Sequence, residues 1–158
     1  MVKKQSISVI FTNSNTFFSY VIRILTKSKW SHCVVVFEDV AVSAELSGVT
    51  TFKVNNFIKS TSEHEIITVP CPDYKEVYDF SYDQIGTPYD YAGLIGLEVD
   101  RDWQDPYKWF CSEMVSTALL KGGVVLPEEW PSAYRITPGM LYDFLHNIKL
   151  GSVNFKTA

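Results

Sequence analysis

Cys111 is the residue best placed for covalent chemistry, because it stands at the first position of the clearest helix in the sequence. Apolar residues recur along residues 111–121 at the spacing of one helical face, and Gly122-Gly123 ends the pattern. The first-turn amides of a helix are unpaired and its dipole is positive at that end, so both stabilise a thiolate. The position predicts either a nucleophilic thiol or a small side chain on the core-facing stripe of the helix.

A cysteine nucleophile also needs a base, and the chain offers three histidines. His32 starts a predicted strand, so a rigid element would hold its ring. His64 lies in a charged stretch and is expected to be solvated. His146 lies on a late helix and is expected at the surface or as a charge near the C-terminal end of that helix. We therefore take His32 as the candidate base.

An acidic partner for His32 follows from the predicted strand pairing. If Glu38-Asp39 form the turn of a hairpin, His32 and Glu45 lie directly opposite each other on one face of the sheet. Directly opposed residues have Cβ atoms about 4.5–5.5 Å apart. A carboxylate there can hold the imidazole tautomer and stabilise the imidazolium. A register shifted by one residue would separate the pair, and Glu45 would then be an ordinary exposed strand carboxylate.

The remaining pattern predicts the elements that must position these side chains. Strands are expected at residues 7–11, 33–37, 40–46, 49–54 and 65–69, with a turn at 12–15. Helices are expected at 17–26 (capped by Thr16), 73–84, 89–97, 111–121 and 139–148, with an extended segment marked by Pro127, Pro131 and Pro138. Without repeats or linkers, the sum is one α+β domain over residues 1–158, an antiparallel sheet packed against a few helices.

Composition excludes several function classes. The chain has 158 residues and a formal net charge of −4, which argues against a nucleic-acid partner. No apolar run reaches the ~18 residues of a membrane-spanning helix. Three cysteines without a CxxC motif, and an N-terminus unlike a signal peptide, predict a reducing, cytoplasmic location. The cysteines and histidines lack zinc spacing, and no phosphate-binding or dinucleotide-binding motif is present, so no cofactor is expected.

The sequence resembles a known family in two ordered motifs. Residues 86–91 (GTPYDY) followed by residues 110–115 (FCSEMV) resemble the GxPY…CSxxV pattern of NlpC-type papain-like cysteine peptidases. In ordinary members the histidine follows the cysteine, whereas here His32 precedes it. This order resembles the circularly permuted, YiiX-like branch, which is related to the lecithin:retinol acyltransferase group. The resemblance extends from about residue 7 to residue 145.

The resemblance implies a permuted papain-like fold and a role for each candidate. Cys111 would be the nucleophile, His32 the base and Glu45 the polar third residue. Tyr89 matches the family's tyrosine beside the cysteine, whose hydroxyl would help the Cys111 N–H to bind the oxyanion; alternatively it is a plain core tyrosine. The implied activity is that of a cysteine peptidase or amidase working through an acyl-enzyme.

Two alternatives remain open at this stage. The first is a thiol-dependent acyltransferase or lipid amide or ester hydrolase, with apolar residues 91–97 receiving a lipid chain. The second is a non-catalytic binding or accessory protein on the same fold. The expected substrate is accordingly a peptide, an amide or an acyl lipid. The absence of an export signal argues against the cell-wall substrates of many NlpC-type enzymes.

Overall fold

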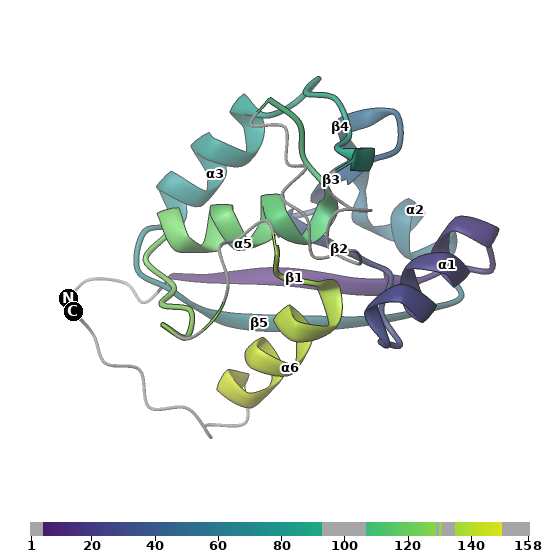
Figure 1. Ribbon diagram of the computed structural model, residues 1–158. Helices are drawn as coiled ribbons and strands as arrows, with labels where there is room; N and C mark the ends of the chain where they lie inside the picture. Colours follow the sequence, from purple (N-terminus) through teal and green to yellow (C-terminus); the bar gives the residue numbers. More distant parts are fainter. Residues whose placement is uncertain (1–4, 93–106, 129, 131–134, 150–158) are drawn as a thin grey trace.

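The computed structural model describes residues 5–92, 107–128, 130 and 135–149, and they form an α+β structure. One five-stranded antiparallel sheet has the order β4-β3-β2-β1-β5. Its strands are β1 (Gln5–Asn13), β2 (His32–Phe37), β3 (Val40–Glu45), β4 (Gly48–Lys53) and β5 (Glu63–Cys71). The helices described are α1 (Phe17–Thr26), α2 (Val54–Lys59), α3 (Tyr74–Asp83), α5 (Cys111–Lys121) and α6 (Pro138–Lys149) (Figure 1).

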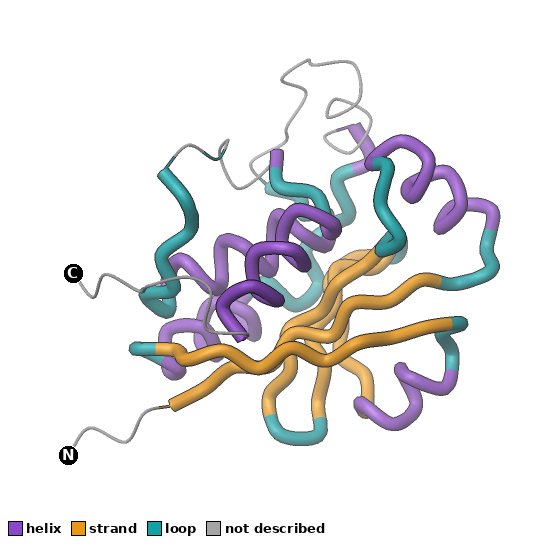
Figure 2. Tube along the Cα trace, turned by 90° about the horizontal axis from the view of Figure 1, so that it is seen from below, coloured by secondary structure: helices purple, strands orange, loops and turns teal. Residues whose placement is uncertain are grey.

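Both faces of the sheet are covered, and the alternation of side chains along β2 shows how. Cys33, Val35 and Phe37 belong to the larger apolar cluster, which they share with α5. Val34 points to the opposite face, where it joins a smaller cluster with Phe57 of α2. Figure 2 shows helices on both sides of the strands. Because one residue of register would exchange these faces, the burial pattern fixes the pairing of β2 with its neighbours.

Most predicted elements are confirmed, and α5 has the predicted bounds. The cap of α1 is also confirmed, because the Thr16 hydroxyl accepts a hydrogen bond from the backbone N–H of Ser19 at 3.2 Å. The strands run one or two residues beyond several predicted ends. Pro70 continues β5, since β5 is an edge strand where a missing N–H is tolerated.

Three local predictions are wrong at least in part, and one helix was not predicted. The predicted turn at 12–15 starts too early, because Thr12 and Asn13 still pair within β1. Helix α2 was not predicted; it has six residues, no side-chain cap and a single buried side chain, Phe57, so its sequence signal is weak. Pro138 begins α6 instead of belonging to an extended segment, in keeping with the preference of proline for the first helical position. The predicted helix at 89–97 starts too early, because Tyr89 forms a β-bridge and Asp90 is not helical, and residues 93–97 lie outside the described residues.

The segment around residues 86–90 is held on two sides, and this places Tyr89 beside the start of α5. On one side Val49 donates to the Thr87 carbonyl at 2.8 Å. On the other side Trp109 donates to the Pro88 carbonyl at 3.1 Å, and Tyr89 and Trp109 form a β-bridge. Gly48 permits the first contact, because its φ of +112° suits glycine and a Cβ there would lie 2.9 Å from the Thr87 oxygen.

Candidate active site

The start of α5 presents Cys111 at the edge of the core. Phe110 precedes it in extended conformation and contributes no side-chain cap, so the first-turn amides are not occupied by a capping side chain. The Cys111 side chain is buried, and α5 packs against β2, which carries His32 and Cys33. The positive end of the helix dipole stabilises a thiolate in this position.

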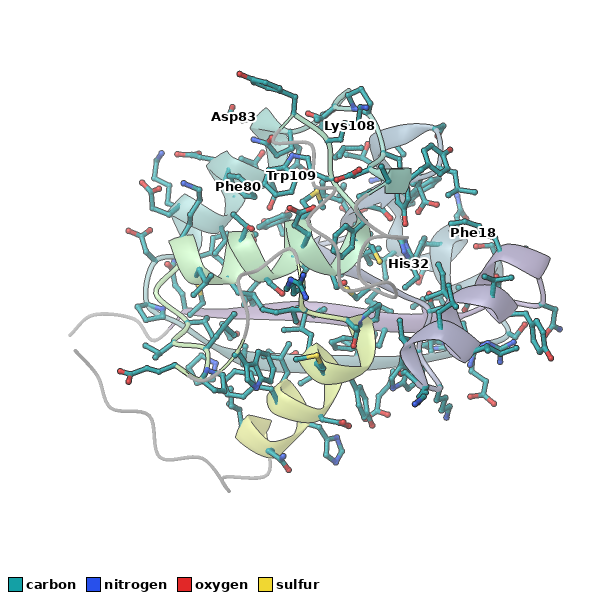
Figure 3. All side chains as sticks on the ribbon, in the orientation of Figure 1. Phe18, His32, Phe80, Asp83, Lys108 and Trp109 are labelled. Atoms are coloured by element: carbon teal, nitrogen blue, oxygen red, sulfur yellow. The ribbon has the colours of Figure 1, made fainter. Side chains whose placement is uncertain are left out.

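The hairpin of β2 and β3 carries the other two candidate residues, His32 and Glu45. The observed register pairs Val36 with Ala41 and Phe37 with Val40, as predicted from a turn at Glu38-Asp39. His32 and Glu45 accordingly meet, with His32 Nε2 3.2 Å from Glu45 Oε1. Figure 3 shows His32 at the end of α5 that points toward α1.

Ser43 is part of this arrangement and was not among the predicted residues. Its hydroxyl lies 2.8 Å from His32 Nε2 and donates to Glu45 Oε1 at 2.5 Å. The sequence carried one usable signal, since residues 43 and 45 share a face of β3. A serine in a strand is common, however, and nothing in its neighbours marks it for chemistry.

The electrostatics of the site favour a charged cysteine–histidine pair. Burial has the largest influence on His32 and alone would lower its pKa. The negative charges of Cys111 and Glu45 outweigh burial and raise the pKa to about 10. The hydrogen bond of Cys33 lowers the pKa of Cys111 most; His32 lowers it further, and together they overcome burial. A lowered pKa on the thiol and a raised pKa on the ring both favour a thiolate–imidazolium pair.

The hairpin contacts one of the two ring nitrogens of His32. Nε2 is the atom held by Ser43 and Glu45, which leaves Nδ1 for the interaction of the ring with Cys111. A ring held on one side in this way can exchange a proton on the other.

Glu45 is ionised throughout the neutral range. Burial would raise its pKa, but the hydrogen bond and charge of His32 and the hydroxyl of Ser43 lower it to about 2. A depressed carboxyl pKa stabilises the fold above the ordinary value of 4.5, and this contribution is lost as the pH falls through the folded pKa.

Replacing Glu45 with glutamine should therefore destabilise the protein most near neutral pH. The difference in free energy of unfolding between E45Q and the unaltered protein should shrink as the pH falls from 4.5 toward 2. Urea unfolding of both proteins over this range measures it, and the other carboxylates cancel in the comparison. A difference that stays constant over this pH range would mean that ionisation of Glu45 does not stabilise the fold.

Tyr89 lies within the same site. It is buried, and its ring packs edge-on against Phe18 of α1 and against Tyr91. Burial first, and then the negative charges of Cys111 and Glu45, raise its pKa well above the ordinary value. The phenol therefore keeps its proton at neutral pH and can donate a hydrogen bond.

A pocket of about 320 Å³ has His32, Glu45 and Tyr89 in its wall, whereas the buried Cys111 is not among its described lining residues. Phe18, Ile22 and Phe57 give it apolar surface, and serines and threonines add hydroxyls from β1, from α1 and from the residues that follow α2. None of the described lining residues is a lysine or arginine. The pocket thus offers hydrogen bonds and apolar contact, and His32 is the basic side chain among its described lining residues.

The other two histidines do not join the site. His64 is exposed on β5. His146 stacks on Tyr142 of α6 and lies 3.6 Å from Glu65 Oε1. Of the three, His32 is the one that interacts with Cys111.

Within the described ranges, no group of three or more cysteine, histidine or acidic side chains gathers as it would around a metal ion. The same residues include no helix with the length and apolarity to cross a bilayer.

In comparisons with known proteins, no family model matches the chain, and no curated protein matches it.

Proposed function

We propose that this protein is a cysteine hydrolase that cleaves an amide or ester through a Cys111 acyl-enzyme. One observation supports it above the rest: Cys111 begins α5 with a lowered pKa, beside a histidine whose far nitrogen contacts Glu45. A buried thiol ordinarily has a raised pKa, as Cys33 and Cys71 do. Lowering the pKa of a buried cysteine takes a dedicated environment, which is characteristic of nucleophiles.

The proposed reaction has two steps. The Cys111 thiolate attacks the carbonyl carbon, and the oxyanion forms where the Cys111 N–H and the Tyr89 hydroxyl can donate. The His32 imidazolium then gives its Nδ1 proton to the departing amine or alcohol, leaving a thioester on Cys111. In the second step the neutral ring takes a proton from water, the resulting hydroxide attacks the thioester, and the acid product leaves.

The proposed fold is the permuted papain-like one. Support comes from the chain order, in which the hairpin bearing His32 and Glu45 precedes the helix bearing Cys111. The antiparallel sheet against which that helix packs is compatible with this assignment.

Acyl transfer to an amine or alcohol remains the second candidate. Most of the segment expected to receive a lipid chain, residues 93–97 of 91–97, lies outside the described residues. The apolar part of the pocket, formed by Phe18, Ile22 and Phe57, favours an acyl chain as a bound group. The first half of the mechanism is unchanged, and only the acceptor of the acyl group differs.

Mass spectrometry of the intact protein with an activated acyl ester tests this function. An adduct on Cys111 that disappears in buffer alone supports hydrolysis. An adduct that persists until an amine or alcohol is added supports transfer instead. The Cys111→Ala variant is the control, and it should acquire no adduct. If the unaltered protein acquires none from any acyl ester or amide tested, the proposal is wrong and a binding role is left.

A further inference from the structure

Ser43 is a fully buried polar side chain on β3. Its neighbours Val42 and Ala44 belong to the larger apolar cluster, so Ser43 lies on the opposite face of the strand, the face of Glu45. A buried hydroxyl costs free energy unless it is hydrogen-bonded. The Ser43 hydroxyl is bonded to two groups of the candidate site, His32 Nε2 and Glu45 Oε1.

The direction of these bonds follows from the single proton of the hydroxyl. Ser43 donates it to the Glu45 carboxylate, which is a pure acceptor when ionised. Toward His32 the same oxygen can only accept, so His32 Nε2 must carry the proton. When the ring is neutral, the bare nitrogen is then Nδ1, the one that serves Cys111.

Ser43 is also nearer to the ring than Glu45. The Ser43 hydroxyl lies 2.8 Å from Nε2, whereas the carboxylate oxygen lies 3.2 Å away. The short bond of 2.5 Å between Ser43 and Glu45 fixes the carboxylate in turn. Ser43 therefore holds both the ring and the carboxylate, beside the direct contact between them.

We propose that Ser43 is a positioning residue that holds the His32 ring in the orientation and tautomer from which Nδ1 exchanges a proton with Cys111. The inference rests on the proposed function of Cys111 and His32. Neither charge nor nucleophilicity alone would suggest that an internal serine holds the ring. Ser43 itself touches neither substrate nor the reacting atoms.

The kinetic test follows alkylation of Cys111 by iodoacetamide against pH. In Ser43→Ala the imidazolium loses a hydrogen bond, so the acid limb of the profile should move up by roughly one pH unit. Below that limb, alkylation should be roughly tenfold slower. Ser43→Thr keeps a hydroxyl and should retain the original profile.

The matched control is Ser81→Ala. Ser81 is equally buried and donates to the Val77 carbonyl within α3, so this variant loses a buried hydroxyl outside the site. Urea unfolding of each variant verifies that it is folded. If S43A and the unaltered protein give superimposable profiles, or S81A shifts as far as S43A, Ser43 does not position the ring.

An NMR readout separates this inference from the proposed function. The proton on His32 Nε2 should give a downfield, slowly exchanging signal in the unaltered protein and in Cys111→Ala. Adding Ser43→Ala should broaden or abolish the signal. If it persists unchanged, Glu45 alone holds the ring and the inference is wrong. Ordinary thiol reactivity at Cys111 would overturn the proposed function, whereas this signal would still test Ser43.

Discussion

Replacing Cys111 with alanine is expected to reduce turnover of an amide or ester substrate by on the order of 10³-fold or more, because the acyl group then has no nucleophile to join. The same change should remove labelling by iodoacetamide at neutral pH. Both results follow from the lowered pKa of Cys111, which leaves the thiol ionised where an ordinary thiol is mostly protonated.

The two other cysteines make the labelling specific. All three cysteines are buried, but burial raises the pKa of Cys33 and of Cys71, so both stay protonated at neutral pH. Peptide mapping after brief labelling should find the modification on Cys111. Cys71→Ala is the matched control and should label like the unaltered protein. Equal labelling of Cys33 and Cys71, or full turnover by C111A, would contradict the assignment of the nucleophile.

The sequence predicted the site best where local rules fix the geometry. A two-residue turn followed by alternating strands determines which residues are opposed, so the contact of His32 with Glu45 could be predicted from the hairpin alone. Apolar periodicity likewise located the start of α5 at Cys111. Both inferences needed only neighbours along the chain.

The part that could not be predicted depends on contacts between distant segments. The Cys33 thiol contributes to the low pKa of Cys111 only because β2 passes beneath the start of α5, and strand periodicity gives no sign of that. Tyr89 reaches the site because residues 86–90 are pinned to both β4 and Trp109. Both are tertiary effects, which propensities do not contain. Ser43 is different, because strand alternation places it on the face of Glu45 but nothing in its neighbours marks it for chemistry.

The proposed chemistry depends on the junction between the hairpin and α5. The hairpin supplies an imidazole fixed at Nε2, and the helix supplies a sulfur at its positive end. Neither element would produce an ionised thiol alone, because burial of Cys111 opposes ionisation. The charges on Cys111 and His32 stabilise each other. Removing one residue should therefore move the pKa of the other back toward its ordinary value.

Replacing His32 with alanine is therefore expected to move the acid limb of Cys111 alkylation to higher pH. Without the imidazolium, only the hydrogen bond of Cys33 opposes burial, so the pKa of Cys111 should rise toward its ordinary value. A thiol with an ordinary pKa is mostly protonated at neutral pH, so alkylation there should fall by roughly tenfold to a hundredfold. Iodoacetamide labelling from acid to alkaline pH, with Cys111 quantified by mass spectrometry, measures the shift.

The control for this change is His146→Ala, which removes a histidine that pairs with Glu65 on another part of the sheet. Its alkylation profile should match that of the unaltered protein. At alkaline pH, where the thiol ionises without help, H32A and the unaltered protein should converge in rate. A persistent difference there would indicate lost access or folding instead of lost ionisation. An unchanged acid limb in folded H32A would show that the imidazole does not stabilise the thiolate, and the proposed mechanism would fail with it.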